Sequence, residues 1–223
     1  MAKLNRKLII LALFILIFYI SITSVTAASF NDVQDKIDTA TGGDDVYLDN
    51  TTYDGSGTEI TIDKDLRVHG GSASDPNRKS TLNAKKLSRI FNVQGNHNVS
   101  FINLNIINGK TSGSGGAVFI SNLIGNLKFI NCNFVNSSTN GSDSHGGAIC
   151  ADNVIVVNSS FVNSSTNGPG SSGGAICAFF NCKVVNSSFV NSSTSENGGA
   201  ILTSNLSVVS SSFVNSLATG SAH

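Results

Sequence analysis

The sequence predicts an all-β fold: a single-stranded parallel β-helix with a short helix at its N-terminal end. The first observation is a ten-residue segment that recurs five times, with starts 28, 27, 28 and 24 residues apart. Its copies read VSFINLNIIN, LKFINCNFVN, VIVVNSSFVN, CKVVNSSFVN and LSVVSSSFVN. The second is a GGAV or GGAI marker between successive copies, at Gly115, Gly146, Gly173 and Gly198. Self-similarity at this period is typical of stacked repeats.

Residues 1–28 have the pattern of a secretory signal peptide. Lys3, Arg6 and Lys7 precede an apolar run at 8–20, and small residues follow near Ala27 and Ala28. The run is short for a membrane span, which needs about 20 apolar residues. The alternative is that this segment is not cleaved and remains as an N-terminal membrane anchor. We expect no other contact with a membrane. Either reading places the rest of the chain outside the cell, secreted or in the cell envelope.

Residues 29–43 are expected to form an amphipathic helix that covers the open end of the stack. Phe30, Val33, Ile37 and Ala40 recur at helical spacing, and a Gly-Gly pair at 42–43 ends the pattern. Residues 44–98 alternate like strands and are expected to form irregular first coils. Residues 99–223 hold the regular coils. They end without an atypical capping unit, so we expect further coils in a longer protein.

Each repeat copy has the chemistry of strand, turn and strand. Short runs of β-branched and aromatic residues are broken by Asn, Ser and Gly, without a 3.6-residue stripe. Alternation predicts that the first and third places, such as Val99 and Phe101, point inward, and that the second place, Ser100, points outward. A coil of about 25 residues with two or three short strands suits a β-helix better than a four-stranded propeller blade.

Stacking should place equivalent residues about 4.8 Å apart, which predicts two ladders. The hydrophobic ladder consists of Ile106, Phe134, Phe161, Phe189 and Phe213. The amide ladder consists of Asn108, Asn136, Asn163, Asn191 and Asn215. Asn side chains in such a column can hydrogen-bond from one coil to the next.

Nine Asn-x-Ser/Thr sequons are candidate N-glycosylation sites in an exported chain. They begin at Asn50, Asn98, Asn136, Asn140, Asn158, Asn163, Asn186, Asn191 and Asn205. An amide held in a ladder is not free to carry a glycan. We therefore favour the ladder for the three sequons that belong to it and keep Asn50, Asn140 and Asn205 as candidate glycosylation sites.

Charge and cysteine content exclude several functions. The formal charge is zero for the whole chain, and without the three basic residues of the signal segment 11 basic residues face 14 acidic ones. A nucleic-acid partner would need a basic face, so none is expected. Four cysteines could form disulfides after export, but buried thiols are favoured. The absence of a CxxC pair and the scattered histidines argue against zinc, and no cofactor is expected.

The markers also carry a family resemblance. GGA[IV] alternating with Phe-Val-Asn coils, behind a segment such as FNDVQDKIDTATGGDDVYLDNTTYDG, resembles the adhesin-like surface proteins of methanogenic archaea. It is similar to the repeats of chlamydial polymorphic outer-membrane proteins, although there the motif is Phe-x-x-Asn. The resemblance covers the chain from about Ser29 onward. It implies a right-handed β-helix of the pectin-lyase-like kind and a role in attachment at the cell surface.

The expected function is therefore a non-catalytic, adhesin-like protein that binds host or microbial surface glycans or proteins. The Gly/Ser/Thr/Asn-rich loops between each ladder Asn and the next Gly-Gly pair differ in length, so they are one place for a binding face. The same loops also suit plain solvent-exposed connections. The alternative is a structural spacer of the envelope.

A polysaccharide lyase or hydrolase is the second alternative, because many β-helices cleave polysaccharides. Such a site would need two or three carboxylates that converge on one face. The regular coils contain three acidic residues, Asp143, Asp152 and Glu196, at non-equivalent positions in different coils. The first half is richer, with acids at turns and strand ends, namely Asp44, Asp45, Asp49, Asp54, Asp63 and Asp65. We expect these to be ordinary solvated acids, so the chain is not expected to be an enzyme.

Overall fold

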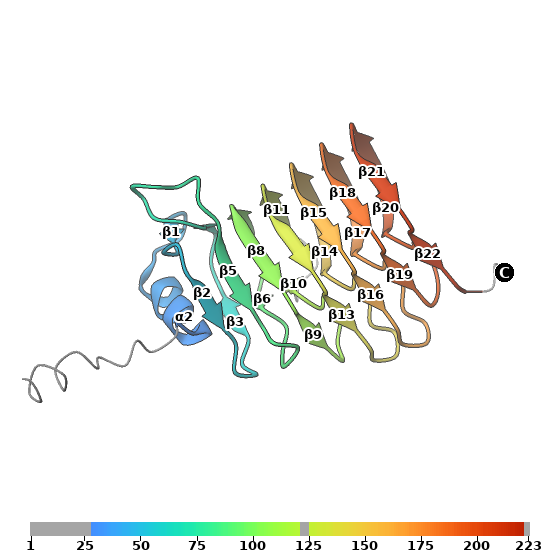
Figure 1. Cartoon of the computed structure of the whole chain (residues 1–223), viewed down its shortest axis with the longest axis horizontal. Helices are drawn as coiled ribbons and strands as arrows, with labels where there is room; N and C mark the ends of the chain where they lie inside the picture. The colour runs from blue at the N-terminus through green and yellow to red at the C-terminus, as the bar shows by residue number, and fades with distance from the viewer. Residues whose placement is uncertain (1–27, 121–124, 221–223) are drawn as a thin grey trace, which may run out of the picture.

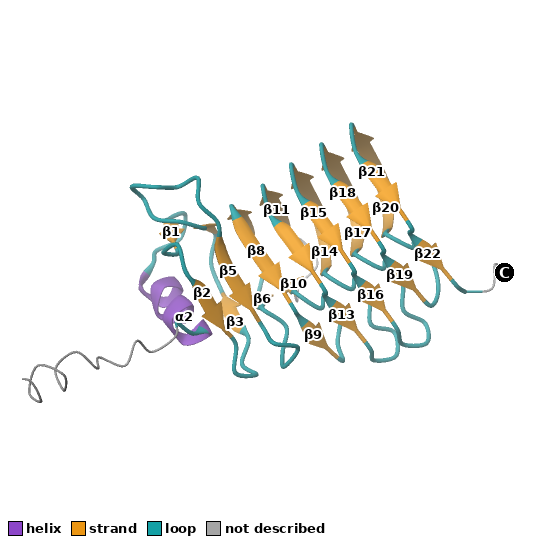
Figure 2. Cartoon of the chain, viewed as in Figure 1, coloured by secondary structure: helices purple, strands orange, loops and turns teal. Residues whose placement is uncertain are grey.

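The chain folds into a right-handed parallel β-solenoid, an elongated stack of coils with one short helix at its N-terminal end (Figure 1). The computed structural model describes residues 28–120 and 125–220. Strands joined by short loops make up nearly all the regular structure of this part of the chain (Figure 2). The predicted all-β class and the predicted end helix are confirmed. Residues 1–27 of the predicted signal segment lie outside the described residues.

Helix α2 (Phe30–Thr39) closes the N-terminal end of the stack. Its apolar face, Phe30, Val33 and Ile37, is fully buried against the first strands β2 (Thr52–Asp54) and β3 (Ile60–Ile62). The carboxylate of Asp32 accepts hydrogen bonds from the backbone N of Ser29 at 2.6 Å and from its Oγ at 2.9 Å. These bonds fix the start of the helix and lower the pKa of Asp32. Apolar spacing in the sequence therefore predicted both the helix and its buried face.

The stack has three parallel sheets, of which two run its whole length and the third begins in the regular coils. The seven-stranded sheet contains β2 (Thr52–Asp54), β5 (Ser80–Asn83), β8 (Leu104–Ile107), β12 (Asn133–Val135), β15 (Ser160–Val162), β18 (Ser188–Val190) and β21 (Ser212–Val214). The five-stranded sheet contains β9 (Lys110–Thr111), β13 (Ser138–Thr139), β16 (Ser165–Thr166), β19 (Ser193–Thr194) and β22 (Leu217–Ala218). The ten-stranded sheet contains β1 (Asp45–Tyr47), β3 (Ile60–Ile62), β4 (Leu66–His69), β6 (Phe91–Val93), β7 (Asn98–Ile102), β10 (Val118–Ile120), β11 (Asn126–Ile130), β14 (Ile149–Val157), β17 (Ile176–Val185) and β20 (Ile201–Val209).

The ten-stranded sheet has two arms that merge in the regular coils. The first half of β14 pairs with β10 and its second half pairs with β11, so one long strand continues both arms. The register shifts between Ala151 and Asn153, where the strand turns from one arm to the other. In β17 the same corner holds two residues, Phe179 and Phe180, and both are exposed. A β-bulge of this kind bends a strand and re-aims its side chains.

The core is built from stacked, inward-pointing columns. The first and third places of the repeat are buried in each coil except the last, whereas the second place points outward. In the hydrophobic ladder the rings of Phe134, Phe161 and Phe189 stack with centroids 4.5 and 4.7 Å apart and nearly parallel planes. Ile106 continues the column and is buried, while Phe213 in the last coil is 41% exposed. Ring stacking adds to area burial as a source of stability.

The Gly-Gly marker is a steric requirement of the stack. The first glycine of each marker has a left-handed backbone, as at Gly146 with φ 67°. The second has no space for a side chain, since a Cβ on Gly147 would lie 2.2 Å from the carbonyl oxygen of Gly174 in the next coil. The following alanine, such as Ala148, is buried. The marker thus lets neighbouring coils approach closely where the five-stranded sheet leads into the ten-stranded one.

Candidate functional site

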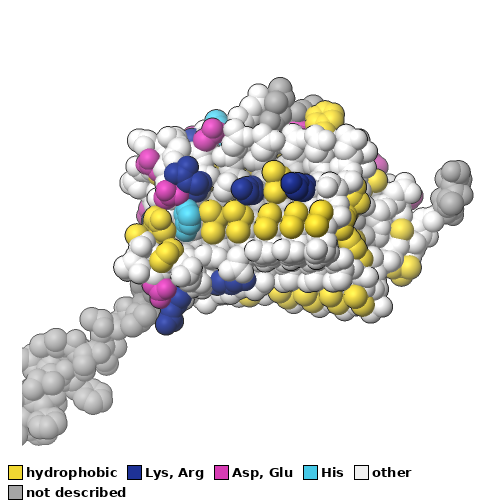
Figure 3. Space-filling model, turned by 90° about the horizontal axis from the view of Figure 1, so that it is seen from above, with side chains coloured by type: hydrophobic (Ala, Val, Ile, Leu, Met, Phe, Trp, Pro, Cys, Tyr) yellow, Lys and Arg dark blue, Asp and Glu magenta, His cyan; other side chains and the backbone are white. Residues whose placement is uncertain are grey.

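The fourth place of the repeat forms an apolar stripe on the outside of the stack. Because side chains alternate, this place shares the outward face with the polar second place. The fourth-place stripe consists of Ile102, Ile130, Val157, Val185 and Val209, and His69 and Tyr47 continue it toward the helix. Figure 3 shows a row of hydrophobic side chains along this face, with Lys or Arg side chains beside it. The second-place residues Lys128 and Lys183 lie on the same face.

A second outward stripe runs along the seven-stranded sheet. The ninth-place stripe consists of Ile107, Val135, Val162, Val190 and Val214, which pair in register from β8 to β21. Its residues are partly buried until the last coil, where Val214 is 48% exposed. Neither outward column was assigned a role from the sequence, although alternation predicts that the fourth and ninth places point outward.

A shallow polar groove lies at the corner between the two stripes. We call it the corner groove; its volume is about 480 Å³. Its lining contains amide and hydroxyl side chains and no charged group: Asn133, Asn158, Ser159, Ser160, Asn186, Ser187, Ser188, Ser210 and Ser212. The fifth place of the repeat makes the corner with a left-handed backbone, φ 50° at Asn158 and 48° at Asn186. Asn tolerates this conformation better than most residues, which explains why it recurs here.

Two of the three amides that line the corner groove are free to bind a ligand; the third, Asn133, is paired with Asn105 and Ser160. Within the part of the chain that the structure describes, the exposed side chains of Asn158 and Asn186 make no hydrogen bond. The serines beneath them are committed to the fold. Ser159 Oγ donates to the Val157 carbonyl at 2.8 Å and accepts from the backbone N of Cys132 at 3.0 Å. The groove therefore has a rigid floor and unpartnered polar groups at its rim, in rows about 4.8 Å apart.

The amide ladder lies at the opposite corner, between the seven-stranded and five-stranded sheets. Each Asn donates from Nδ2 to Oδ1 of the Asn one coil before it, at 2.9 Å for Asn108 to Asn83, 3.4 Å for Asn136, and 3.1 Å for Asn163, Asn191 and Asn215. All five ladder residues have φ between 52° and 57°. The ladder is on the surface, half-exposed or exposed, so it fixes turns and links coils rather than filling the core.

A further Asn column, not predicted from the sequence, precedes the repeat. Asn98, Asn126, Asn153, Asn181 and Asn205 precede the first place of the five copies and pair in register. Nδ2 of Asn126 donates to Asn98 at 2.6 Å, and that of Asn181 to Asn153 at 2.7 Å. Among the glycosylation candidates, Asn50 and Asn140 are exposed, whereas Asn205 donates to Asn181 at 3.3 Å. By the criterion used for the first ladder, Asn205 is the least free of the three.

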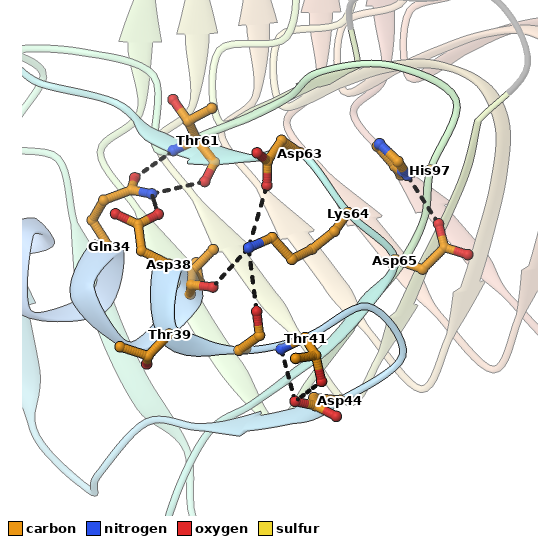
Figure 4. A network of polar contacts seen from close by, with 12 residues as sticks. Gln34, Asp38, Thr39, Thr41, Asp44, Thr61, Asp63, Lys64, Asp65 and His97 are labelled. Atoms are coloured by element: carbon orange, nitrogen blue, oxygen red, sulfur yellow. Dashed lines mark hydrogen bonds and ion pairs between the residues drawn. The ribbon is translucent and has the colours of Figure 1, made fainter.

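The aspartates of the first half are engaged in the structure of the first coils. In Figure 4, Gln34 of α2 is hydrogen-bonded to Thr61 of β3, and Lys64 reaches the backbone at the end of the helix. The Asp44 carboxylate accepts from the N and Oγ of Thr41, at 2.8 and 2.7 Å, and Asp65 contacts His97 at 3.1 Å. The remaining acids form ion pairs: Asp49 with Lys36, Asp54 with Lys85, and Asp63 with Lys64.

Asp45 lies between two basic side chains, Arg67 and His69. Its carboxylate accepts from Arg67 Nε at 2.6 Å and contacts His69 Nε2 at 2.8 Å. These hydrogen bonds lower the pKa of Asp45 to about 2. The Tyr47 ring stacks on the His69 ring with centroids 4.7 Å apart. The cluster closes the helix end of the fourth-place stripe.

The acids of the regular coils lie in different surroundings. Asp152 is 1% exposed at the bulge of β14, and neither carboxylate oxygen has a partner among the described residues. Burial raises its pKa. Asp143 has a left-handed backbone in the loop after β13, and Glu196 follows β19. None of these three acids lines the corner groove.

The four cysteines are free and buried. Cys150 and Cys177 each follow a GGAI marker and pair in register in one column. Burial raises the pKa of Cys132 and of Cys182 to about 12, so these thiols are unreactive. Across residues 28–120 and 125–220, no group of three or more His, Cys, Asp or Glu side chains is arranged to hold a metal ion.

Comparisons with known proteins give no relative for this chain: no protein-family model, no curated protein and no solved structure matches it. Within the described residues, no helix has the length and apolar character needed to cross a membrane.

Proposed function

We propose that the chain is a non-catalytic, adhesin-like protein, secreted or held in the cell envelope, whose corner groove binds a neutral surface glycan. The observation that carries the proposal is the pair of exposed, unpartnered amides of Asn158 and Asn186 on neighbouring coils. The export signal expected at 1–28 supports the location. The likeness of the repeats to adhesin-like surface proteins supports the role.

The chemistry of the groove favours a sugar polymer over other ligands. A neutral glycan offers hydroxyl groups that donate and accept, and its ring C–H faces can lie on apolar side chains. The groove presents amide and hydroxyl groups without charge, and Val157 and Val162 belong to the stripes on either side. Each hydrogen bond contributes only about 0.5–1.5 kcal/mol net. Affinity would therefore come from the repetition of equivalent contacts along several coils.

A non-catalytic role agrees with the placement of the acids. Catalysis of glycan cleavage requires paired carboxylates on either side of the scissile bond. The corner groove has none, and the first-half acids are engaged with lysine, arginine, histidine or backbone partners. The uniform, ladder-linked surface also supports the second candidate function, a rigid spacer in the envelope that binds no glycan.

The test is retention of glycans by the folded full chain, produced in a host that does not glycosylate it. The chain is incubated with a panel of neutral and acidic glycans, and bound and free material are identified by mass spectrometry. The double variant Asn158→Gly, Asn186→Gly removes both amides and keeps the left-handed backbone, which glycine adopts without strain. Asn140→Gly, an exposed Asn outside the groove, is the matched control.

The proposal predicts that a neutral glycan is retained intact, and that the double variant binds it about 5- to 150-fold more weakly, from the loss of roughly 1–3 kcal/mol of hydrogen bonding. The Asn140→Gly control should bind like the unaltered chain. Shortened glycan in the free fraction would instead identify a lyase or hydrolase. Retention of no glycan at all would favour the spacer.

A further inference from the structure

The four cysteines occupy two different environments. Cys132 and Cys182 belong to the continuous hydrophobic core, whereas Cys150 and Cys177 are also buried but lie outside that core. The isoleucine that precedes each of the latter two residues points into the core. Because side chains alternate along a strand, Cys150 and Cys177 point to the outer side of the ten-stranded sheet. Core packing therefore accounts for the first two cysteines and not for the second two.

The two outer cysteines are direct neighbours. Cys150 in β14 and Cys177 in β17 are paired in register on adjacent parallel strands. Equivalent atoms of such strands lie about 4.8 Å apart. The thiol of Cys150 donates a hydrogen bond to the sulfur of Cys177, which lowers the pKa of Cys177 and raises that of Cys150. The two sulfur atoms therefore face each other across a single strand spacing.

Polar groups surround the outer side of this thiol pair. The side chain of Ser114 hydrogen-bonds to Cys150. Arg89 holds the Ser114 loop, because its Nη2 donates to the Ser114 carbonyl at 2.8 Å while its Nη1 donates to the Glu59 carboxylate at 3.0 Å. The positive charge of Arg89 also favours the ionised form of Cys150. Groups that orient and charge a ligand in this way are typical of the surroundings of metal sites.

We propose that Cys150 and Cys177 form a two-coordinate site for a soft monovalent metal ion, Cu(I), which binds between the two sulfur atoms. Thiolates are among the soft ligands that select Cu(I). Metal–thiolate bonds are about 2.3 Å long, so a linear S–Cu–S unit spans about 4.6 Å, close to the ~4.8 Å between neighbouring strands. Binding forms two Cu–S bonds and releases both thiol protons to solvent, without a change of oxidation state. The bound ion would join β14 to β17 on the outside of the sheet.

Cu(I) fits this pair better than zinc or a disulfide bond. Structural zinc takes four ligands, and the described part of the chain brings no three His, Cys, Asp or Glu side chains together for a metal. A disulfide needs sulfur atoms about 2 Å apart and a torsion near 90°, which side chains that point the same way from parallel strands rarely reach. A cavity of about 230 Å³ beside Cys177, lined also by Phe179 and Thr203, gives an ion a path to the sulfur atoms.

The first experiment titrates the reduced full chain with Cu(I) under nitrogen, in competition with a coloured Cu(I) chelator whose absorbance reports the copper that it loses. One ion per chain is expected to transfer to the protein. Cys150→Ser and Cys177→Ser keep the size of the side chain, and each should abolish this transfer. Cys132→Ser and Cys182→Val are the matched controls, because the third copy of the repeat has serine and valine at these two places. Both controls should bind copper like the unaltered chain.

The second measurement needs no variant. X-ray absorption spectroscopy of the copper-loaded, unaltered chain should show a Cu(I) ion with two sulfur neighbours and no nitrogen or oxygen ligand. A different ligand set would overturn the proposal, as would a reduced chain that takes no copper from the chelator. Equal copper binding by the unaltered chain and the Cys150→Ser, Cys177→Ser double variant would also overturn it, because the ion would then bind elsewhere.

Discussion

Replacing Phe161 by alanine should lower the free energy of unfolding by about 3–5 kcal/mol, the range typical of large aromatic truncations in a close-packed core. The Phe161 ring is fully buried and stacks on Phe134 at 4.5 Å and on Phe189 at 4.7 Å. Its removal therefore deletes two ring contacts and leaves a cavity inside the column. The rigid coils on either side cannot collapse to fill it.

Phe213→Ala is the matched control, because Phe213 belongs to the same column in the last coil. It is 41% exposed and stacks on one ring only, Phe189, at 4.8 Å. The expected loss is roughly 1–2 kcal/mol, less than half that at Phe161. The assay is equilibrium denaturation by urea. Equal losses for the two variants would refute the reasoning that the column is a continuous core whose last layer is open.

Three further predictions concern the backbone, the amide ladder and pH. Gly147→Ala should lower the melting temperature, because its Cβ would meet a backbone oxygen of the next coil at 2.2 Å, whereas Gly42→Ala, with nothing within 4 Å, should leave it unchanged. Asn163→Leu should lower the free energy of unfolding, measured by urea denaturation, by about 1–3 kcal/mol, because ladder hydrogen bonds are lost and the left-handed backbone is strained. Asn163→Gly should lower it by less, because glycine adopts this backbone without strain. Equal losses for the two variants would contradict this reasoning. The folded-state pKa of Asp45 is depressed to about 2, so its stabilisation is present above about pH 4 and is lost as the pH falls toward 2. The difference in melting temperature between the unaltered chain and Asp45→Asn should therefore be constant from pH 5 to 7, shrink as the pH falls from 4 to 2, and vanish below about pH 2.

The stack could be predicted from the sequence because its repeats obey one strong rule. Alternation placed Val99 and Phe101 inside, and helical spacing placed Phe30 and Val33 on the buried face of α2. The same alternation puts the fourth and ninth residues of each repeat on the outer surface. The two outward stripes could therefore also have been predicted from the sequence. The column that begins at Asn98 was equally visible, since an Asn precedes each copy.

The corner groove could not be predicted in this way. Asn131 and Asn158 hold the same place of the repeat with nearly the same backbone, φ 53° and 50°. Nδ2 of Asn131 donates to Asn103 at 2.7 Å, while Asn158 and Asn186 leave their amides free within the described part of the chain. Which amides bond and which stay free depends on side-chain orientation in three dimensions. The identity of the residues is the same in both cases.

The central claim is that the corner groove binds a neutral glycan through the amides of Asn158 and Asn186. The most direct test is a titration that reports which Asn side chains contact the glycan. The full chain, labelled with ¹⁵N, is titrated with the retained glycan, and the side-chain amide signals are followed by NMR spectroscopy. The account predicts that the amides of Asn158 and Asn186 shift, while the ladder amides of Asn136 and Asn163 do not. Shifts confined to Asn140 and Asn167, in the loops after the five-stranded sheet, would contradict it and place binding in those loops.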